Sequence, residues 1–409
     1  MLRFPVQRGI ARRRGSSKRR EPRVVVTGGG TAGHALPALA VARALVGRGL
    51  PAASIEFVGS RRGVEARLAG DAGFSFTLLR GRGVQRRLAL ANVLAVGGLM
   101  AATARSMLSM ARRRPSVVIA LGGYASLPYG VSAALLRVPL IVVATDVLPG
   151  ATSRVLGRFA KACAVAFEVT TMPRALVTGA PVRDAVVRAR DERLRIPRWS
   201  TCQRDGGAID GVHARLRDGP PGPIRPLLVA FGGSLGARSI NAAVAGMVRD
   251  WGRRPPVDVH HVIGSRDWLR FDHAGSTGGN VRYVALEYDD RLPEVLAASD
   301  LAICRSGAGT VAELSVIGVA SILVPLPGAP RDHQTANARV LSSAGAAVCL
   351  SDADLDGERL TSEVMSLLGS PERLTAMSEA ARCLGAPDAS MRVADLALMH
   401  AGRIAGASG

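Results

Sequence analysis

The stretch VVVTGGGTAGHALPALAVARAL, residues 24–45, decides the fold of the N-terminal half of this 409-residue chain. Its β-branched start (24–27) predicts a buried strand, and the glycine-rich run after it (28–37) predicts a turn. The alanines and leucines that follow predict a helix over 38–49. Three more strands are predicted in this half, at 55–59, 117–121 and 140–144. Short apolar strands that alternate with helices indicate a parallel sheet covered on both faces.

The second half repeats this pattern after a stretch rich in proline, glycine and charge. Strands are predicted at 227–231, 260–264, 301–304 and 321–325, with a helix that begins near Ser239. We therefore expect an α/β protein with two Rossmann-like, doubly wound parallel-sheet domains that face a cleft, where ligands usually bind. The expected parts are a basic mobile tail (1–21), an N-terminal domain (22–188), a linker or insertion (189–226), a C-terminal domain (227–385) and a C-terminal helix that returns toward the N-terminal domain (386–409).

Composition narrows the classes of function. Hydrophobic residues make up 48% and charged residues 21%, which is typical of a folded chain. The net charge of +21 predicts an anionic partner: a nucleic acid, a membrane surface or a phosphorylated substrate. Aromatic residues make up only 4%, so the stacking platforms of nucleic-acid-binding proteins are lacking. The five cysteines are scattered, which favours a reducing compartment over a disulfide framework or a zinc site.

An uncharged segment over 88–104 raises the question of membrane contact. It is flanked by Arg86 and Arg87 on one side and by Arg105 and 112–114 on the other. Seventeen residues only just reach the length of a membrane span, and polar and glycine residues lower the apolarity. A buried or surface-lying helix is therefore favoured over a span. No apolar stretch follows the basic N-terminal residues, so no secretory signal is expected there.

The first glycine-rich turn carries a histidine. Gly28, Gly30 and Gly33 satisfy the spacing of a dinucleotide-binding turn, but the next predicted strand places Glu56 in its middle, with no acid at its end to hold a ribose. A nicotinamide or flavin cofactor is therefore disfavoured. His34 would lie in the interdomain cleft, where an imidazole suits general acid–base catalysis near pH 7. The alternative is that it only packs the start of the helix.

Two more glycine-rich turns, over 231–241 and 305–314, precede helices in the second half. Helix N-termini carry unpaired N–H groups that can hold a pyrophosphate, and Ser234 lies in the first of these turns. Glu313, one helical turn beyond Gly309, suits a contact to ribose hydroxyls. No Asp-x-Asp pair follows a strand in a metal-binding position, and neither a P-loop nor a nucleophile elbow occurs. We therefore expect a nucleoside diphosphate ligand, with no metal ion and no cofactor.

These motifs together resemble one family. The runs GGGTAGHALPALAVARAL, GGYASLP, PGATSR, GAPVR, FGGSLGARSIN, CRSGAGTVAEL and DHQTANA are similar, in order and spacing, to the MurG family over about residues 22–400. The resemblance implies a GT-B fold and an inverting transferase of peptidoglycan synthesis at the cytoplasmic face of the membrane, as a peripheral protein. The implied donor is UDP-N-acetylglucosamine, and the implied acceptor is the 4-hydroxyl of undecaprenyl-pyrophosphoryl-muramoyl-pentapeptide.

The resemblance also implies site residues. His34 would be the catalytic base, Ser234 would contact the donor phosphate, Glu313 the ribose and Gln334 a sugar hydroxyl. Arg183 matches an arginine at the domain junction. The whole implied set is Thr31, Ala32, Gly33, His34, Arg183, Ser234, Ala308, Gly309, Thr310, Val311, Ala312, Glu313 and Gln334.

Two departures from the family pattern leave an alternative open. The family's His-Glu-Gln-Asn is Val143-Ala144-Thr145-Asp146 here, so a donor-contacting asparagine becomes Asp146, and the linker is longer. The alternative is a GT-B transferase that moves a UDP-hexose or hexosamine to another lipid or natural-product acceptor. For either acceptor lipid, the 88–104 segment and its arginines would lie on an anionic membrane surface. No nucleic acid is expected as a partner.

Overall fold

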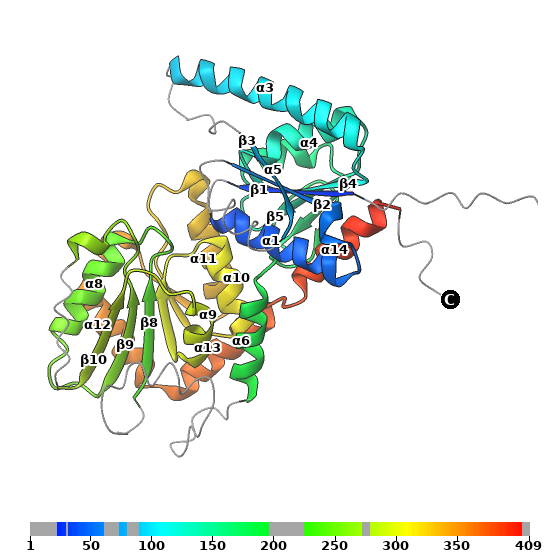
Figure 1. The fold of residues 1–409 in the computed structure, drawn as a ribbon. Coiled ribbons are helices and arrows are strands. Elements are labelled where there is room, and N and C mark those ends of the chain that lie inside the picture. The colour runs from blue at the N-terminus through cyan, green and yellow to red at the C-terminus, as the bar shows by residue number, and fades with distance from the viewer. Residues whose placement is uncertain are drawn as a thin grey trace, which may run out of the picture.

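The chain forms two α/β lobes, each built on a wholly parallel sheet, with the ends of the two sheets turned toward one another (Figure 1). The computed structural model describes residues 23–29, 32–60, 73–79, 90–195, 225–271 and 279–402. The predicted basic tail and most of the predicted linker lie outside these residues.

The N-terminal sheet has seven strands in the order β3-β2-β1-β4-β5-β6-β7, which is a doubly wound arrangement. Its central strand β1 is buried along its whole length, as the apolar run in the sequence predicts. The strands are β1 (Val24–Gly29), β2 (Ile55–Ser60), β3 (Ser75–Leu79), β4 (Val117–Gly123), β5 (Leu140–Ala144), β6 (Ala162–Val165) and β7 (Ala175–Val177). The helices are α1 (Ala32–Gly47), α3 (Leu90–Arg113), α4 (Ser126–Leu135) and α5 (Ala151–Gly157).

The C-terminal sheet has six strands in the order β10-β9-β8-β11-β12-β13. The strands are β8 (Leu227–Phe231), β9 (Val257–Val262), β10 (Val281–Leu286), β11 (Leu301–Cys304), β12 (Ser321–Leu323) and β13 (Ala347–Cys349). The helices are α6 (Asp184–Arg195), α8 (Arg238–Arg249), α9 (Leu292–Ala298), α10 (Ala308–Ile317), α11 (His333–Ser343), α12 (Gly357–Leu368), α13 (Pro371–Leu384) and α14 (Ala389–His400). The expected fold class, two facing Rossmann-like domains, is confirmed.

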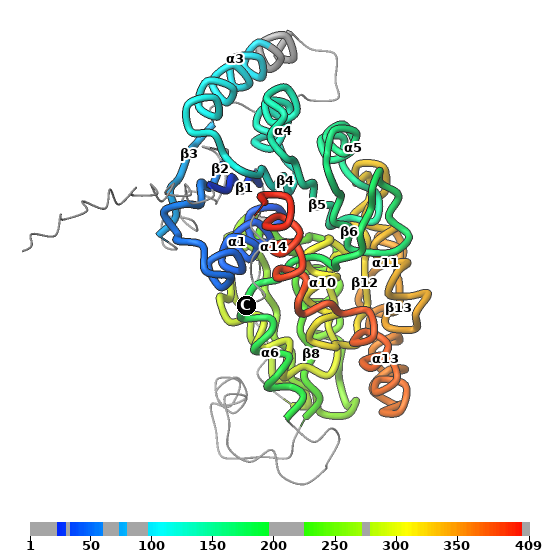
Figure 2. The backbone as a smooth tube through the Cα atoms, turned by 90° about the vertical axis from the view of Figure 1, so that its right-hand side faces the viewer, coloured from blue at the N-terminus to red at the C-terminus, as the bar shows by residue number. Residues whose placement is uncertain are grey.

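Two helices, α6 and α14, pass between the lobes. Val182 and Val186, at the start of α6, share a core with β8 and α10 of the C-terminal lobe. The last helix, α14, lies along α1, where its Val393 and Leu396 join the core of the N-terminal lobe (Figure 2). The predicted boundary at residue 188 falls inside α6, so residues 189–195 are helical rather than irregular. The domain limits themselves stay a prediction.

The first helix begins earlier than the sequence predicts. We expected it at Ala38, after Pro37, but α1 starts at Ala32 and contains Pro37. Pro37 is the sixth residue of this helix, so it lacks the N–H that would bond to the carbonyl oxygen of Gly33, and its ring crowds that carbonyl. Because α1 starts at Ala32, His34 belongs to the first turn of the helix instead of to a loop. The predicted strand over 260–264 likewise begins three residues earlier, at Val257.

Candidate active site

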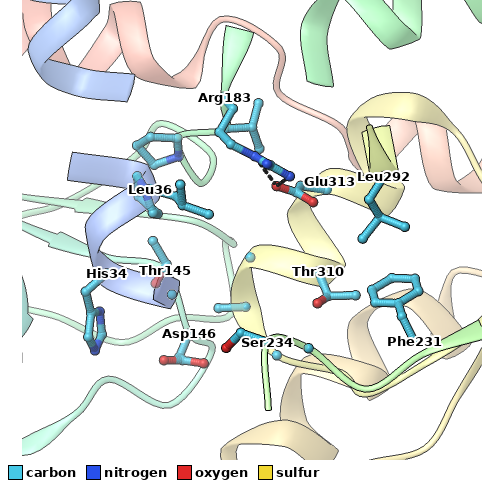
Figure 3. Close-up of a pocket in the computed structure, with 18 of the residues that line it drawn as sticks. His34, Leu36, Thr145, Asp146, Arg183, Phe231, Ser234, Leu292, Thr310 and Glu313 are labelled. Carbon is cyan, nitrogen blue, oxygen red and sulfur yellow. Dashed lines mark hydrogen bonds and ion pairs between the residues drawn. The ribbon is translucent and has the colours of Figure 1, made fainter. Parts of the chain in front are cut away.

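One pocket lies where the two lobes meet, and it collects segments from both (Figure 3). The N-terminal lobe contributes the start of α1 and the residues after β5. The C-terminal lobe contributes the turn after β8, the residues after β10 and the start of α10. The lining residues are Gly33, His34, Leu36, Pro37, Thr145, Asp146, Pro181, Val182, Arg183, Phe231, Gly233, Ser234, Val262, Tyr288, Asp289, Leu292, Gly307, Ala308, Gly309, Thr310, Glu313 and His333.

The start of α10 forms one wall of the pocket. Gly307 precedes the helix with an extended backbone, and no side chain caps it. Ala308, Gly309 and Thr310 line the pocket, so the unpaired N–H groups of the first turn are available to a ligand. Such groups, together with the helix dipole, favour an anion such as a phosphate.

The turn after β8 lies beside this helix start. Gly233 and Gly236 both have positive φ angles, of 86° and 84°. A Cβ atom at Gly236 would lie 2.1 Å from the carbonyl oxygen of Ile263, so only glycine fits there. This tight turn places Ser234 at the pocket, beside the residues of α10.

A mostly buried arginine, Arg305, connects the segment before α10 to the segment that follows the β8 turn. Arg305 donates through Nη1 to the carbonyl oxygens of Val324 and Pro325, at 3.1 Å each, and forms an ion pair with Asp352. Its Nη2 donates to Oγ of Ser239 in the first turn of α8. Arg305 therefore links the turn before α10 to the start of α8, and it fixes the two helix starts relative to one another.

His34 lies on the opposite side of the pocket, in the N-terminal lobe. Its ring packs against the end of β4, where a Cβ atom at Gly122 would lie 3.3 Å from Cε1 of His34 and 3.6 Å from Oγ of Ser153. The side chain is half-buried. The imidazole is thus held by close packing at the edge of a pocket whose far wall can bind an anion.

Arg183 and Glu313 are bonded to one another on the pocket wall, as the dashed line in Figure 3 shows. Nε and Nη2 of Arg183 both donate to Oε1 of Glu313, at 3.1 and 3.0 Å. Burial raises the pKa of the Glu313 carboxyl, and the charge and hydrogen bonds of Arg183 oppose that rise. Two residues implied separately by the family resemblance therefore act here as one unit.

Not every residue implied by the sequence lies at the pocket. Val311 and Ala312 point into the core of the C-terminal lobe. The side chain of Gln334 is used within its own lobe, since Oε1 accepts a hydrogen bond from the N–H of Leu326 at 2.9 Å. Thr31 lies outside the described residues, and so does the side chain of Ala32, although Ala32 begins α1.

A residue that the sequence analysis missed, Asn337 of α11, joins the two lobes. It is fully buried. Its Nδ2 donates to Oδ1 of Asp146 at 2.9 Å and to the carbonyl oxygen of Ser306 at 3.2 Å, while its Oδ1 accepts from the N–H of Val147 at 3.0 Å. The signal was present in DHQTANA, where Asn337 stands three residues after Gln334. Asp146, noted in the sequence only as a departure, lines the pocket.

Neither a metal-binding cluster nor a membrane-spanning helix occurs among the residues that the structure describes. In the parts of the chain that the structure describes, no group of three or more His, Cys, Asp or Glu side chains could hold a metal ion. Glu56 lies near the start of β2 and not at its end, where a dinucleotide would need an acid, and it accepts from Oγ1 of Thr77 at 2.7 Å and pairs with Arg113. No described helix, α3 included, has the length and apolarity needed to cross a membrane.

The fold and this pocket define a two-lobed transferase of the GT-B class, with an anion-binding wall in one lobe and a candidate base in the other. Comparison with known proteins agrees. The N-terminal domain model of glycosyltransferase family 28 matches residues 24–165, and the C-terminal domain model of the same family matches residues 227–402.

Similar proteins narrow the family. Two relatives named UDP-N-acetylglucosamine–N-acetylmuramyl-(pentapeptide) pyrophosphoryl-undecaprenol N-acetylglucosamine transferase come from Desulforudis audaxviator and Alkalilimnicola ehrlichii. They are 36% and 38% identical, over 93% and 92% of this chain and 99% of each relative. The crystal structure of Acinetobacter baumannii MurG superposes with a TM-score of 0.70 at 28% identity, covering 92% of this chain and all of that one. The chain belongs to the MurG family of glycosyltransferase family 28.

Proposed function

We propose that the protein transfers N-acetylglucosamine from UDP-N-acetylglucosamine to the 4-hydroxyl of lipid-linked muramoyl-pentapeptide, a step of peptidoglycan synthesis. The observation that carries this proposal is the similarity to transferases of that name along almost the whole chain. The pocket supports it, since one wall suits a diphosphate and the other presents His34. The alternative, transfer to an unrelated acceptor, is not favoured by these relatives.

The residues divide the chemistry between the lobes. The N–H groups at the start of α10 and the turn that holds Ser234 would bind the diphosphate, and they would stabilise the charge that develops on the departing UDP. His34 would accept the proton of the acceptor hydroxyl as that oxygen attacks the anomeric carbon from the opposite face. A single displacement of this kind inverts the configuration at that carbon. In this scheme neither a metal ion nor a cofactor takes part.

The test of the reaction is radiolabel transfer from UDP-N-acetylglucosamine to the lipid-linked muramoyl-pentapeptide in detergent, with and without EDTA. UDP-glucose and UDP-galactose serve as competing donors. We expect label in the lipid product from the first donor alone, and the same rate with EDTA. Hydrolysis of the donor without transfer to this acceptor would contradict the proposal and would point to a different acceptor.

We also propose that the N-terminal lobe meets the membrane, at its cytoplasmic face, through α3 and its neighbours. Helix α3 lies at the outer end of this lobe in both views, above α4 (Figures 1 and 2). Met100, Ala104 and Leu108 form an exposed stripe along α3, and the side chains of Met100 and Leu108 are 69% and 53% exposed. The opposite face, with Ala102 and Met110, is buried.

Exposed arginines occur on α3 itself and on a nearby helix. Arg105 and Arg112 of α3 are exposed, and so are Arg154 of α5 and Arg158 directly after it, and α5 packs against α4, which in turn packs against α3. An apolar stripe with flanking arginines suits the surface of an anionic bilayer, where an acceptor with a polyprenyl tail is found. Of the predicted segment, residues 88 and 89 and the arginines at 86 and 87 lie outside the described residues.

The membrane proposal is tested by co-sedimentation with vesicles. A Met100→Asp, Leu108→Asp variant should bind anionic vesicles much more weakly than the unchanged protein, and transfer to a short-chain soluble acceptor should stay the same. The matched control is Leu269→Asp, because Leu269 is an apolar residue that is even more exposed, at 92%, but lies in the C-terminal lobe. Vesicle binding that survives in the double variant would exclude α3 as the membrane contact.

A further inference from the structure

In the ion pair between Arg183 and Glu313, the guanidinium bonds to only one of the two carboxylate oxygens. Arg183 directly precedes α6, while Glu313 lies in α10, 130 residues further along the chain. Both donors of the guanidinium, Nε and Nη2, go to the same carboxylate oxygen, Oε1. The second oxygen, Oε2, is not used by the arginine. Both side chains are mostly shielded, at 25% and 15% exposure, and both line the pocket.

The position of Glu313 along α10 indicates which part of a bound nucleotide Oε2 would meet. Glu313 is four residues beyond Gly309, which corresponds to about 6 Å along the helix axis. A diphosphate bound at the first turn of α10 would therefore bring the ribose of the same nucleotide to the level of Glu313. A carboxylate can accept hydrogen bonds from neighbouring ribose hydroxyls, and it does so most strongly when it is ionised.

Arg183 has two possible tasks in such a pocket, and the geometry separates them. A free guanidinium would contact the phosphates directly. Here two of its five N–H groups are already used by Glu313. A buried carboxylate without a partner would tend to take up a proton and would lose its ability to accept from both hydroxyls. The arginine therefore fixes the orientation of the carboxylate and keeps it ionised.

We propose that Arg183 is a positioning residue for the nucleoside end of the donor, which holds Oε1 of Glu313 so that Oε2 faces the ribose hydroxyls. This inference rests on the proposed function, because it requires a nucleoside diphosphate in the pocket. Arg183 then contributes to donor affinity through Glu313, and its contribution depends on the ribose hydroxyls.

The experiment compares the affinities of UDP and 2′-deoxy-UDP by calorimetry. The unchanged protein should prefer UDP by about ten-fold, the value of one hydrogen bond to a charged group. Arg183→Met and Glu313→Gln should each lose most of this preference. The double variant should bind UDP about as weakly as Glu313→Gln alone, because the two residues act on the same contact. Arg183→Lys keeps the positive charge but not the planar guanidinium, so its preference for UDP should lie between those of the unchanged protein and of Arg183→Met.

The matched control is Arg190→Met in α6, the helix that Arg183 precedes, since Arg190 pairs only with its neighbour Asp191 among the described residues. It should keep both affinities. The ratio of the two affinities is measured on one protein sample, so partial unfolding cannot change it. If Arg183→Met weakens both ligands equally and keeps the ratio, Arg183 acts on the phosphates and this inference is wrong. If the unchanged protein binds neither ligand, the proposed donor fails as well.

Discussion

The two lobes support their sides of the pocket by different means. In the C-terminal lobe, the groups that face the proposed diphosphate site are mainly backbone N–H groups, and buried polar side chains hold them in place. Below the turn after β8, His261 contacts Oη of Tyr283 at 2.9 Å and Oδ1 of Asn241 at 3.1 Å. Burial lowers the pKa of His261 to about 3, so this histidine stays neutral and structural.

In the N-terminal lobe the arrangement is reversed, because the group that faces the ligand is a side chain and the support is close backbone packing. A Cβ atom at Gly123 would lie 1.9 Å from the carbonyl oxygen of Gly29, and one at Gly28 would lie 2.9 Å from that of His34. These glycines bring β1, β4 and α1 together behind the imidazole. Around the proposed diphosphate site and its facing base, substitutions that remove a side chain should therefore affect the rate in the N-terminal lobe and the stability in the C-terminal lobe.

The largest expected effect is that of His34→Ala on turnover. Loss of a general base lowers the rate by about 10²–10⁴-fold. Binding of UDP, which the C-terminal lobe provides, should stay unchanged, and calorimetry checks this. His400→Ala at the end of α14 is the control and should keep full activity. Unchanged turnover of His34→Ala would show that His34 only packs the helix start.

The next largest effect is that of Arg305→Met on stability. The substitution leaves Asp352 without its buried partner and leaves the carbonyl groups of Val324 and Pro325 without their donor. Breaking a fully buried ion pair costs about 3–5 kcal/mol, and we expect the lower end of that range because the two side chains are still 11% and 21% exposed. Urea unfolding measures the loss, and Arg249→Met, an exposed arginine on α8, should stay within about 0.5 kcal/mol. A loss below about 1 kcal/mol would show that Arg305 is not the main support of this wall.

The same contrast explains what the sequence could predict. Strands β5, β8 and β11 have the predicted limits, because each is a short apolar run between turn residues. The start of strand β9 was missed because Asp258 interrupts the apolar pattern of its first three residues, whereas His260 and His261 were already inside the predicted strand. All three polar residues are buried, and the side-chain partners of the two histidines come from other segments of the chain. A polar residue buried in this way cannot be distinguished by pattern from one that faces solvent.

At the site, glycine-rich turns and helix starts are local features, so the wall made by Ser234 and Ala308–Thr310 could be predicted. The pairs that support the pocket could not. Arg183 meets Glu313, and Arg305 meets Asp352, only after the strands have brought distant segments together. Family resemblance gave a role to Glu313 but no partner for it.

A smaller loss of stability is expected for a substitution of Asn337, whose side chain bonds to backbone and side-chain groups of both lobes. Asn337→Ala would leave the N–H of Val147, the carbonyl of Ser306 and one oxygen of Asp146 without their partner. Each such loss in a buried place costs about 1–3 kcal/mol, and relaxation of the lobes should reduce the total toward that of a single group.

Because the substitution loosens the contact between the two lobes that carry the ligand sites, we expect KM for both substrates to rise more than kcat falls. Steady-state kinetics with each substrate varied in turn measures this split. Asn280→Ala, where an exposed asparagine donates to the carbonyl of Arg254, is the matched control. A fall in kcat with unchanged KM would contradict the role of Asn337 in joining the lobes.

The smallest effect is expected where the C-terminal helix meets α1. Arg48 and Asp395 form an ion pair at 2.6 Å, but both side chains are exposed. Exposed pairs contribute about 0–1 kcal/mol, and salt screens them. Arg48→Met and Asp395→Asn should each change the free energy of unfolding by less than about 1 kcal/mol. At high salt, both variants should be as stable as the unchanged protein. A double-mutant cycle that gave a larger, salt-independent coupling would mean that this pair, and not the burial of Val393 and Leu396, holds α14 on the N-terminal lobe.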